Sequence, residues 1–458
     1  MIAQVCFQDM AMPWSGERCD TLLPRPTPVT RRELLLSSGS AAGLLSAACG
    51  RAGGRAEQPE QPAKITQPVT LLYWTILGGA DGSRMKELSQ QYAKEHPLVT
   101  IEDIQGVPDF LTKFASSVVT GTAPDVVCIR QIYVPGFAEG NMLFDLLPRE
   151  LQQVGLKAED FDPNVWRASE YKGKRYSIPL DIHGYMLFYN ASVVAESGLD
   201  PNKPPQTWND WLDWIRQLTR SDRHGGFVSD GGEGLIWTFY HHLRQAGGTL
   251  FSDDGKKAAF NSAAGHTALS FMAEVFLRAN QPLPQPLLDM FEQRRVASFL
   301  NGPWNLNRLG RPDNPVFNDL RVGFAPQLDP ARPAWWAQSH QLALPRQDKV
   351  DEHKRAVAFD FVRWLVEHTL DWSVAGQLPA NRRILNSDEF QKSTHPVIGH
   401  LKVWERHLAS ASFMQLHPRY VDTIPVLIPP LQQGVRNQLA PRAALEQAEQ
   451  AVNALLSQ

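Results

Sequence analysis

The stretch Val69-Thr70-Leu71-Leu72-Tyr73-Trp74 opens a series of short apolar runs that decides the fold. Its β-branched and aromatic residues predict a buried strand. Apolar residues at helical spacing follow and end before Pro97, and the alternation then repeats. The predicted series is a strand at 69–74, a helix around 85–92, a strand at 99–102, a helix at 110–118 and a strand at 126–130. Because alternating strands and helices form parallel sheets, the sequence predicts an α/β fold.

Helices dominate the prediction for the middle and the end of the chain. Thr207 is placed to cap a helix that continues through Leu218, a second helix is expected at 267–280, and a long one contains the apolar stripe of 357–365. Several tryptophans fall on these helical patterns, where packing in a core explains them: Trp208, Trp211, Trp214, Trp364 and Trp372.

Length and charge limit the classes of protein to consider. A chain of 458 residues exceeds one ordinary core, so we expect more than one domain. The formal net charge of −3 argues against a nucleic-acid partner, whose binding site needs a basic patch. After residue 48 no apolar run approaches the roughly 18 residues that a membrane span needs.

The first 67 residues predict export and membrane attachment. Arg31-Arg32 precedes a short apolar run, as in a twin-arginine export signal, and we expect residues 1–48 to be that signal. Small residues before Cys49 resemble a lipobox, although Leu45 stands one place early, so we expect an acyl anchor on Cys49. Residues 49–67 have the composition of a flexible tether. Cys128 is the remaining cysteine after Cys49, so no disulfide framework, metal site or cofactor is expected.

Six ordered stretches together resemble the family 1 extracellular solute-binding proteins, the maltose-binding-protein type. They cover most of residues 69–390. They are Gly121-Thr122-Ala123-Pro124-Asp125-Val126, Gly173-Lys174-Arg175-Tyr176-Ser177-Ile178-Pro179 with Tyr189-Asn190, Gly198-Leu199-Asp200, Pro205-Gln206-Thr207-Trp208, Gly247-Gly248-Thr249-Leu250-Phe251, and Phe299-Leu300-Asn301-Gly302-Pro303-Trp304.

The resemblance implies the two-lobe periplasmic-binding-protein fold of type II, with the ligand in the cleft between two α/β lobes. It assigns residues 68–180 and 341–378 to the N-terminal lobe, and 181–340 and 379–458 to the C-terminal lobe. The connections between the lobes are then expected at 181–185, at 339–344 and near 376–380.

Aromatic candidates follow from the chemistry of sugars, whose flat C–H faces stack on aromatic rings. Trp304 matches the ring-stacking tryptophan of the family, with burial in the lobe core as the alternative. Of Trp335 and Trp336, one is expected to face the cleft. Trp74 ends the first strand, where α/β sites form, although burial is equally consistent with its position. Trp237 is the last candidate.

Polar candidates lie where the resemblance places sugar contacts. After the third strand these are Arg130, for which a surface ion pair is the alternative, with Gln131 and Tyr133. At the first hinge, Asp181 and His183 are both candidates, and a bond between lobes is the alternative for Asp181. Charged groups form shorter and stronger hydrogen bonds to hydroxyls than neutral groups do. The remaining candidates are Gln338, His340 and Arg382.

The predicted function is capture of a mono- or oligosaccharide by a monomeric lipoprotein and its delivery to the membrane subunits of an ABC importer. A polyamine or glycerol-phosphate is the alternative ligand, because Asp81, Asp109 and Asp181 supply acids. An exported glycan-active enzyme and a membrane-attached sensor are alternatives of other classes. Ser-elbow, His-Glu zinc and P-loop motifs are absent from the sequence, so we expect no catalysis.

Overall fold

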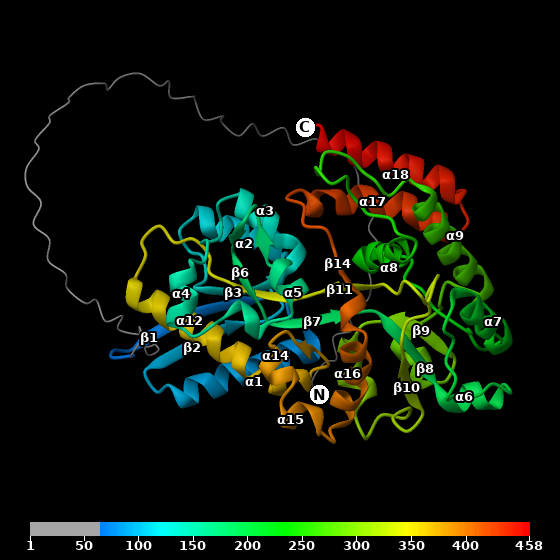
Figure 1. The fold of residues 1–458 in the computed structure, drawn as a ribbon, viewed down its shortest axis with the longest axis horizontal. Coiled ribbons are helices and arrows are strands. Elements are labelled where there is room, and N and C mark those ends of the chain that lie inside the picture. The colour runs from blue at the N-terminus through cyan, green and yellow to red at the C-terminus, as the bar shows by residue number, and fades with distance from the viewer. Residues whose placement is uncertain (1–64) are drawn as a thin grey trace, which may run out of the picture. The chain divides into compact units, whose positions relative to one another are not determined.

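The computed structural model describes residues 65–458, and the strands of its N-terminal part form the sheet predicted from the sequence (Figure 1). We call it the first sheet. β1 pairs in parallel with both of its neighbours, whereas β12 runs antiparallel to β3 and β6. The strand order is β2 (Val99–Ile104), β1 (Val69–Thr75), β3 (Val126–Arg130), β12 (His340–Ala343) and β6 (Ser177–Pro179).

Helices α1 (Gly79–Glu95) and α2 (Phe110–Val119) connect the parallel strands, which confirms the predicted alternation. The two faces of β3 belong to different hydrophobic clusters: Cys128 packs on the side of β1 and α1, and Val127 packs on the side of α2. Tyr73 of β1 meets Phe361 of α12 (Glu352–Glu367) edge to face at 5.3 Å. Burying each such side chain stabilises the fold by roughly 1.5–3 kcal/mol.

A second sheet contains β10 (Leu320–Gly323), β8 (Met186–Asn190) and β9 (Ser298–Asn301), and both of its pairings are antiparallel. The prediction of parallel pairing therefore holds for β1 to β3 but not here. β9 and β10 each run against β8, whose direction is set by the strand β7 that it continues. The helices beside this sheet are α6 (Ala191–Glu196), α7 (Trp208–Leu218) and α9 (Ala263–Arg278).

Local capping explains where these helices begin. Thr207 accepts a hydrogen bond from the Asp210 backbone N–H, and the Asp210 carboxylate accepts one from the Thr207 N–H, so the predicted cap is confirmed. α9 begins four residues earlier than predicted, because the Ser262 side chain accepts from Gly265 N and caps it. Trp208 stacks on Phe271 of α9 at 4.2 Å, so it serves the core as expected.

A connecting sheet lies between the first and second sheets in Figure 1. Its strand order is β13 (Leu378–Pro379), β7 (Asp181–Gly184), β11 (Trp335–Gln338) and β14 (Ala411–Phe413). β7 follows β6 of the first sheet and leads into β8 of the second, while β11 leads through Ser339 into β12. The three segments predicted to connect the lobes thus include β7, β12 and β13, and β13 pairs directly with β7.

Glycine is required where β7 meets β11. A Cβ on Gly184 would lie 1.9 Å from the Trp336 carbonyl oxygen and 2.6 Å from the Trp335 ring, so no larger side chain fits. Gly376, just before β13, has a φ of +95°, a conformation that favours glycine. Both positions hold chain segments close together at the junction of the sheets.

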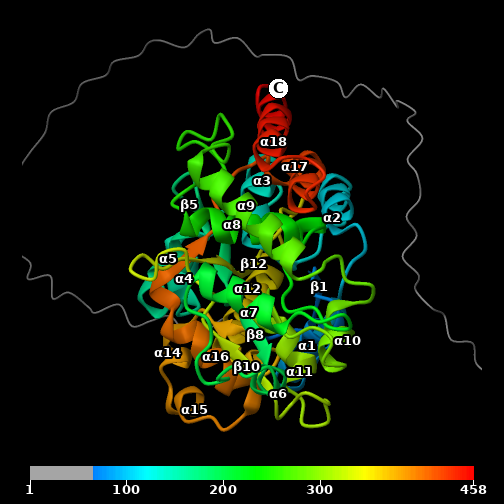
Figure 2. The same cartoon turned by 90° about the vertical axis from the view of Figure 1, so that its right-hand side faces the viewer.

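The C-terminal helices α17 (Tyr420–Val435) and α18 (Pro441–Leu456) pack on one another and on α8 (Gly232–Gln245) and α9 (Figure 2). The other helices are α3 (Val134–Glu139), α4 (Pro148–Gln153), α5 (Pro163–Arg167), α10 (Leu287–Glu292), α11 (Leu306–Leu309), α13 (Thr369–Ser373), α14 (Arg382–Leu385), α15 (Asp388–Gln391) and α16 (Pro396–Arg406). The short elements are the 3₁₀ turns η1 (Gln131–Tyr133), η2 (Ala158–Asp160), η3 (Pro303–Asn305) and η4 (Leu408–Ser410) and the hairpin β4 (Glu170–Tyr171) with β5 (Lys174–Arg175).

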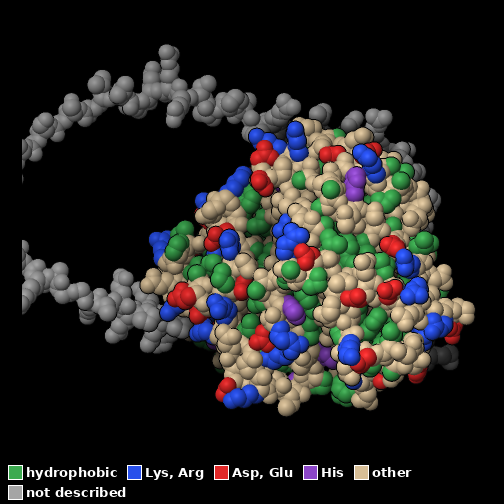
Figure 3. Space-filling model, turned by 45° about the vertical axis from the view of Figure 1, so that its right-hand side comes forward, with side chains coloured by type: hydrophobic (Ala, Val, Ile, Leu, Met, Phe, Trp, Pro, Cys, Tyr) green, Lys and Arg blue, Asp and Glu red, His purple; other side chains and the backbone are tan. Residues whose placement is uncertain are grey.

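Two further observations concern the surface and the N-terminal predictions. On the face drawn in Figure 3, acidic and basic side chains are interspersed. Within residues 65–458, no helix combines the length and the apolar character that crossing a membrane requires. The predicted export signal, Cys49 and the tether as far as residue 64 lie outside the described residues.

Candidate ligand-binding site

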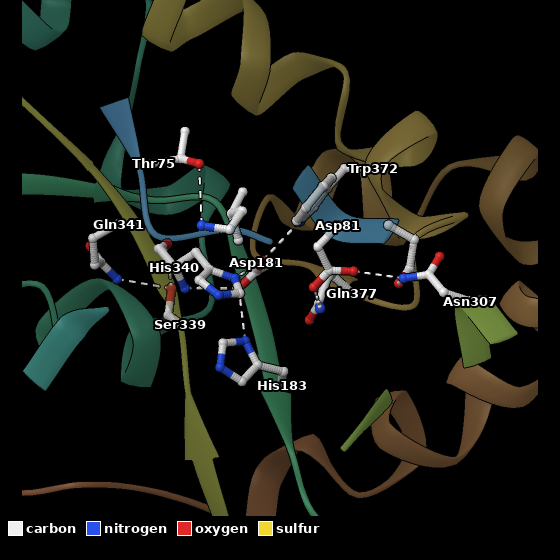
Figure 4. Close-up of polar contacts among 12 residues, drawn as sticks. Thr75, Asp81, Asp181, His183, Asn307, Ser339, His340, Gln341, Trp372 and Gln377 are labelled. Carbon is white, nitrogen blue, oxygen red and sulfur yellow. Dashed lines mark hydrogen bonds and ion pairs between the residues drawn. The ribbon is translucent and has the colours of Figure 1, made fainter. Parts of the chain in front are cut away.

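The carboxylate of Asp181 lies at the start of β7, where it accepts four hydrogen bonds (Figure 4). His340 donates from its backbone N–H at 2.9 Å, and its Nδ1 lies 2.7 Å from Oδ2. His183 Nδ1 lies 3.1 Å from Oδ1, and Trp372 Nε1 donates at 2.8 Å. This one buried carboxylate therefore joins the connecting sheet to the first sheet and to α13.

These contacts set the charge state of His183. Burial raises the pKa of Asp181, but His340 and the hydrogen bonds from both histidines outweigh it and hold that pKa below its usual range. Burial, together with the neighbouring His340, lowers the pKa of His183 to about 4. Because an ionised carboxylate only accepts hydrogen bonds, the neutral His183 must carry its proton on Nδ1. Its Nε2 is then an acceptor, and nothing in residues 65–458 donates to it.

Asp181, His183 and His340 also place possible metal-ligand atoms within 4.8 Å of one another. The donor set argues for a hydrogen-bonded network instead. The carboxylate already accepts four hydrogen bonds, which use the lone pairs that a metal would need. The N···O separations of 2.7 and 3.1 Å are those of hydrogen bonds.

We call the side chains of Tyr185, Trp237, Trp304 and Trp336 the aromatic cluster, and two of its rings, those of Trp304 and Trp336, lie beside His183. Trp237 of α8 stacks on Trp336 of β11 with centroids 4.9 Å apart and planes at 12°. Trp304 of η3 stands at 78° to Trp336 at 6.4 Å, and Tyr185 lies 4.6 Å from Trp336. His183 is 5.9 Å from Trp304. Trp237 and Trp304 are partly exposed, whereas Trp336 is fully buried.

A charged group lies beside this cluster. Arg130, at the end of β3, donates from Nη1 to Glu233 Oε2 at 2.9 Å and to Tyr133 Oη at 2.7 Å. Its guanidinium also lies 5.1 Å from the centre of the Trp237 ring. Glu233 lies in the first turn of α8, where a negative charge is favoured by the helix dipole. The pair therefore links the first sheet to α8.

A second acidic group, Asp81 in the first turn of α1, makes a similar link. Its carboxylate accepts from Asn307 Nδ2 at 2.6 Å and from Gln377 Nε2 at 3.0 Å. Burial raises the pKa of Asp81 to about 6, although both hydrogen bonds act against that rise. α1 is thus tied to α11 and to the segment before β13.

Several buried polar atoms near the sheet ends lack a hydrogen-bond partner within the described residues. In or beside the aromatic cluster they are two donors, Trp237 Nε1 and Trp336 Nε1, and one acceptor, Glu233 Oε1. Buried polar groups in native proteins are nearly always paired. A solute that offers both hydroxyl donors and acceptors would satisfy atoms of both kinds.

Residues 78–369 match the family model described as bacterial extracellular solute-binding protein. The match covers more than half of the chain. The chain belongs to this family. The family match confirms the resemblance that the six ordered stretches indicated. The alternating strands and helices of this solute-binding protein, and its connecting strands, agree with the fold that the resemblance implied.

Solved structures share the fold over most of the chain. The cyclic alpha-maltosyl-1,6-maltose binding protein from Arthrobacter globiformis has a TM-score of 0.70 and 25% identity, covering 85% of this chain and 99% of that one. An ABC transporter solute-binding protein from Thermotoga Lettingae, bound with alpha-D-tagatose, has a TM-score of 0.72 and 23% identity, covering 85% of this chain and 100% of that one. The second supports the fold alone.

The match to a curated relative is shorter. The sn-glycerol-3-phosphate-binding periplasmic protein UgpB of Escherichia coli (strain K12) is 26% identical over 177 residues. The match covers 36% of this chain and 39% of that protein, so the chain spans well under half the length of the curated relatives it matches.

The structure brings most of the predicted contact residues of this solute-binding protein together. Trp336 is the member of its pair that belongs to the aromatic cluster, whereas Trp335 donates to the His407 carbonyl at 2.8 Å on the other face; both rings are fully buried. Trp74 is partly buried against the same hydrophobic cluster as Trp304. The predicted residues that gather around Asp181 and the aromatic cluster are Arg130, Tyr133, His183, Trp237, Trp304, Trp336 and His340.

Three other predicted residues are placed differently. Gln131 and Gln338 are fully buried, and both contact Met414 through their amides, at 3.4 Å in each case. Arg382 is exposed at the first position of α14 and makes no side-chain hydrogen bond or ion pair within residues 65–458. Nothing in the structure links Arg382 to the other candidates.

Sequence reasoning missed three residues of the site. Glu233 follows two glycines and stands one helical turn before Trp237, a spacing that could have suggested a shared face. Tyr185 lay inside the predicted first hinge but was not singled out as a contact. Trp372 was assigned to core packing, which its burial agrees with, but its Nε1 also holds Asp181.

Proposed function

We propose that this protein is the sugar-binding component of an ABC importer, capturing a mono- or oligosaccharide outside the cytoplasm and delivering it to the membrane subunits. The observation that carries the proposal is the aromatic cluster beside His183, bordered by buried polar atoms that lack partners. Stacking on tryptophan suits the C–H face of a pyranose, and the unpaired atoms suit its hydroxyls. A related structure, 25% identical to this chain, is that of a binding protein for cyclic alpha-maltosyl-1,6-maltose, in agreement with this chemistry.

The glycerol-phosphate binder among the curated relatives supports a second candidate ligand. The charges beside the aromatic cluster favour an uncharged solute there. Asp81, Asp181 and Glu233 are carboxylates, and Arg130 is already paired with Glu233. A phosphate placed among them would meet like charge. A polyamine is less well supported, because Asp109, one of the acids proposed for it, is exposed at the start of α2.

We propose binding without turnover. A glycosidase needs two carboxyl groups that can exchange protons or attack the sugar. The carboxylate of Asp181 is held by four donors and has a lowered pKa, which suits neither an acid nor a free nucleophile.

Ligand capture is proposed to close two lobes, residues 68–180 with 341–378 and residues 181–340 with 379–458. The Arg130–Glu233 and Asp81–Asn307 contacts would then join one lobe to the other. A ligand shifts such an equilibrium only by its difference in affinity for the two states. The importer would recognise the closed state. The binding protein would act as a monomer.

Export and anchoring are proposed from residues Arg31, Arg32 and Cys49. Acylation of Cys49 would keep the binding domain near its importer and raise its effective concentration. Mass spectrometry of the membrane fraction tests this: the wild type should carry an acylated N-terminal peptide that begins at Cys49, and C49S should lack it. A wild-type protein recovered without acyl chains would refute the anchor.

A thermal-shift panel tests the ligand class. Neutral mono- and oligosaccharides, polyamines and sn-glycerol-3-phosphate would be compared on the purified protein. A ligand at a hundredfold excess over its Kd should add about 2.7 kcal/mol of stability. A rise in Tm with at least one sugar, and none with polyamines, is expected. A rise with a polyamine alone would refute the sugar proposal.

A further inference from the structure

Asp81 stands where the two proposed lobes meet beside the connecting sheet (Figure 4). It lies in the first turn of α1, in the first proposed lobe, whereas Asn307 belongs to α11 in the second. Asn307 Nδ2 donates twice, to Asp81 Oδ1 at 2.6 Å and to the Ala375 carbonyl at 2.5 Å. Gln377, in the segment before β13, donates from Nε2 to Asp81 Oδ2 at 3.0 Å. Both carboxylate oxygens are therefore bonded, and Asn307 is the partner that would move away if the lobes separated.

No cation neutralises this carboxylate within residues 65–458. Both of its hydrogen-bond partners are neutral amides. The arginines of the two helices that meet here pair with other acids: Arg84 of α1 with Glu87 and Asp371, and Arg308 of α11 with Asp289 and Glu292. A partly buried carboxylate without a counter-charge is costly to keep ionised.

Burial is the main cause that raises the pKa of Asp81 to about 6. Of the two titratable neighbours on the adjoining strands, His340 of β12 lowers this pKa and the ionised Asp181 of β7 raises it further. An aspartate in water titrates near pH 3.9. Separation of the lobes would remove Asn307 and admit water, so the pKa of Asp81 would fall toward that value. The closed arrangement therefore binds a proton more tightly than an open one.

Gln377 offers a place for that proton. Its side chain is fully buried, and its Oε1 has no hydrogen-bond partner in the described part of the chain. Half a turn of the amide about its last bond exchanges Oε1 and Nε2, so that Oε1 faces Asp81 Oδ2. A proton on Oδ2 then donates to Oε1, while Oδ1 still accepts from Asn307. One amide atom of Gln377 is unpaired before and after the exchange, so the proton is bound without loss of a hydrogen bond.

We propose that closure of the lobes over the solute takes up one proton from solution, held on Asp81 Oδ2 between Gln377 and Asn307. This inference rests on the proposed sugar-binding function and adds a proton to its binding step. The proton comes from the solvent, so the binding protein gains one positive charge as it closes. Asp81 acts as a positioning residue and not as a sugar contact, because its charge state decides how readily α1 and α11 meet.

The two pKa values of Asp81 give the size of the effect. With about 6 in the closed arrangement and about 3.9 in an open one, Asp81 should raise the affinity for the solute about ninefold between pH 7 and pH 5. His183 acts in the opposite sense if closure buries it, because burial favours its neutral form. The contribution of Asp81 is therefore measured as the difference between the wild type and D81N.

Isothermal titration calorimetry in buffers of different ionisation enthalpy counts the protons taken up on binding. The probe is whichever of glucose, galactose, maltose and maltotriose gives the largest thermal shift. The wild type should take up about 0.7 of a proton more than D81N at pH 5.5, and about 0.1 more at pH 7. E352Q, which removes an exposed acid from the first turn of α12, should match the wild type.

D81N also separates this role from that of a purely structural contact. The new amide can accept from Asn307 and donate to Gln377 Oε1, as the protonated carboxyl group would. D81N should therefore bind the probe at pH 7 at least as tightly as the wild type, and its rise in affinity toward pH 5 should be about ninefold smaller. D81S, which cannot titrate either, gives the proton count if D81N fails to fold.

Two results would overturn the inference and leave the sugar-binding function standing. One is equal proton uptake by the wild type and D81N at pH 5.5. The other is weaker binding by D81N at pH 7 with an unchanged pH dependence, which would make the contact purely structural. Absence of binding heat with all four probes would remove the proposed function, and the proton uptake with it.

Discussion

The guanidinium of Arg130 and the carboxylate of Glu233, 2.9 Å apart, join the end of β3 to the first turn of α8. Both side chains are partly exposed, so the solvent can reach and separate them. Arg130 also lies against the face of Trp237. This contact holds helix α8 to strand β3 of the first sheet. It is therefore placed to stabilise the closed arrangement of the two proposed lobes.

Replacing Glu233 with Gln should therefore weaken ligand binding. Removing a partly exposed ion pair should cost about 1 kcal/mol or less. If that energy favours the closed arrangement, affinity for the ligand should fall by about fivefold. Calorimetric titration with the best ligand of the thermal-shift panel measures it.

The matched control for E233Q is D422N. It removes the Arg419–Asp422 pair, which has a similar separation of 3.0 Å but lies in the first turn of α17. Affinity should be unchanged in D422N. An equal loss in both variants would show that the Arg130–Glu233 contact has no special part in binding.

Trp304 should contribute to binding and little to the fold. The ring is partly exposed, and its edge approaches Trp237 and Trp336. Trp304→Ala should weaken sugar binding by about 2 kcal/mol or more, roughly thirtyfold, with a small change in the Tm of the unliganded protein. Thermal shifts with and without sugar measure both. A large loss of Tm without ligand would identify Trp304 as a core residue.

Trp335 provides the opposite case. Its ring is fully buried against Gly184, and its Nε1 donates to His407. Trp335→Ala should lower the free energy of unfolding by about 3–5 kcal/mol, because it leaves both a cavity and an unpaired carbonyl. Urea denaturation measures the loss. A mild effect would mean that the ring is not packed as the structure shows.

Much of the fold was predictable because its signals are local. The apolar runs of β1 and β3 and the capping residue Thr207 each act over a few residues, and each gave the observed element. The start of α9 was predicted at residue 267, four residues too late, because the capping residue Ser262 was not recognised. Whether the strands of the second sheet pair parallel or antiparallel depends on which strands, distant in the sequence, become neighbours. Hydrophobic periodicity does not contain that information.

The site was predictable only in part, because its contacts join residues that are distant in the sequence. Arg130 and Glu233 are 103 residues apart, and Asp181 and Trp372 are 191 apart, so no local pattern connects them. Alternation in β11 implies that Trp335 and Trp336 point to opposite faces, but only the pairing of β11 with β7 decides which face is the site.

The protonation of His183 can be observed directly. Because Asp181 accepts from its Nδ1, the neutral ring should carry the proton on Nδ1 at pH 7, with Nε2 free to accept from a ligand hydroxyl. Nitrogen-15 NMR of the histidine rings distinguishes the two tautomers, with H183Q used to assign the signals. Adding sugar should shift the Nε2 resonance most. A proton found on Nε2 would contradict the proposed role of Asp181 in orienting this ring.

Buried neutral histidines should make the protein sensitive to acid. Burial lowers the pKa of His241 to about 3, and burial together with a neighbouring side chain, His340 for His183 and Arg321 for His400, lowers the pKa of each of these two to about 4. Unfolded histidine titrates near 6.5, so between that pH and about 4 the unfolded chain binds more protons than the native one. Their contribution to stability is complete above pH 6.5 and is lost as the pH falls toward 4. Asp81 acts in the opposite sense, because its pKa is raised to about 6.

Urea denaturation at intervals between pH 7.5 and 4.5 measures this dependence. H400Q should flatten the fall in unfolding free energy, since one of the protons taken up on unfolding is removed. H395Q, at the exposed N-cap of the same helix α16, five residues before His400, should leave the slope unchanged. D81N should steepen the fall, because it removes the opposing group. A wild-type stability that stays constant across the range would show that these histidines are not buried in their neutral form.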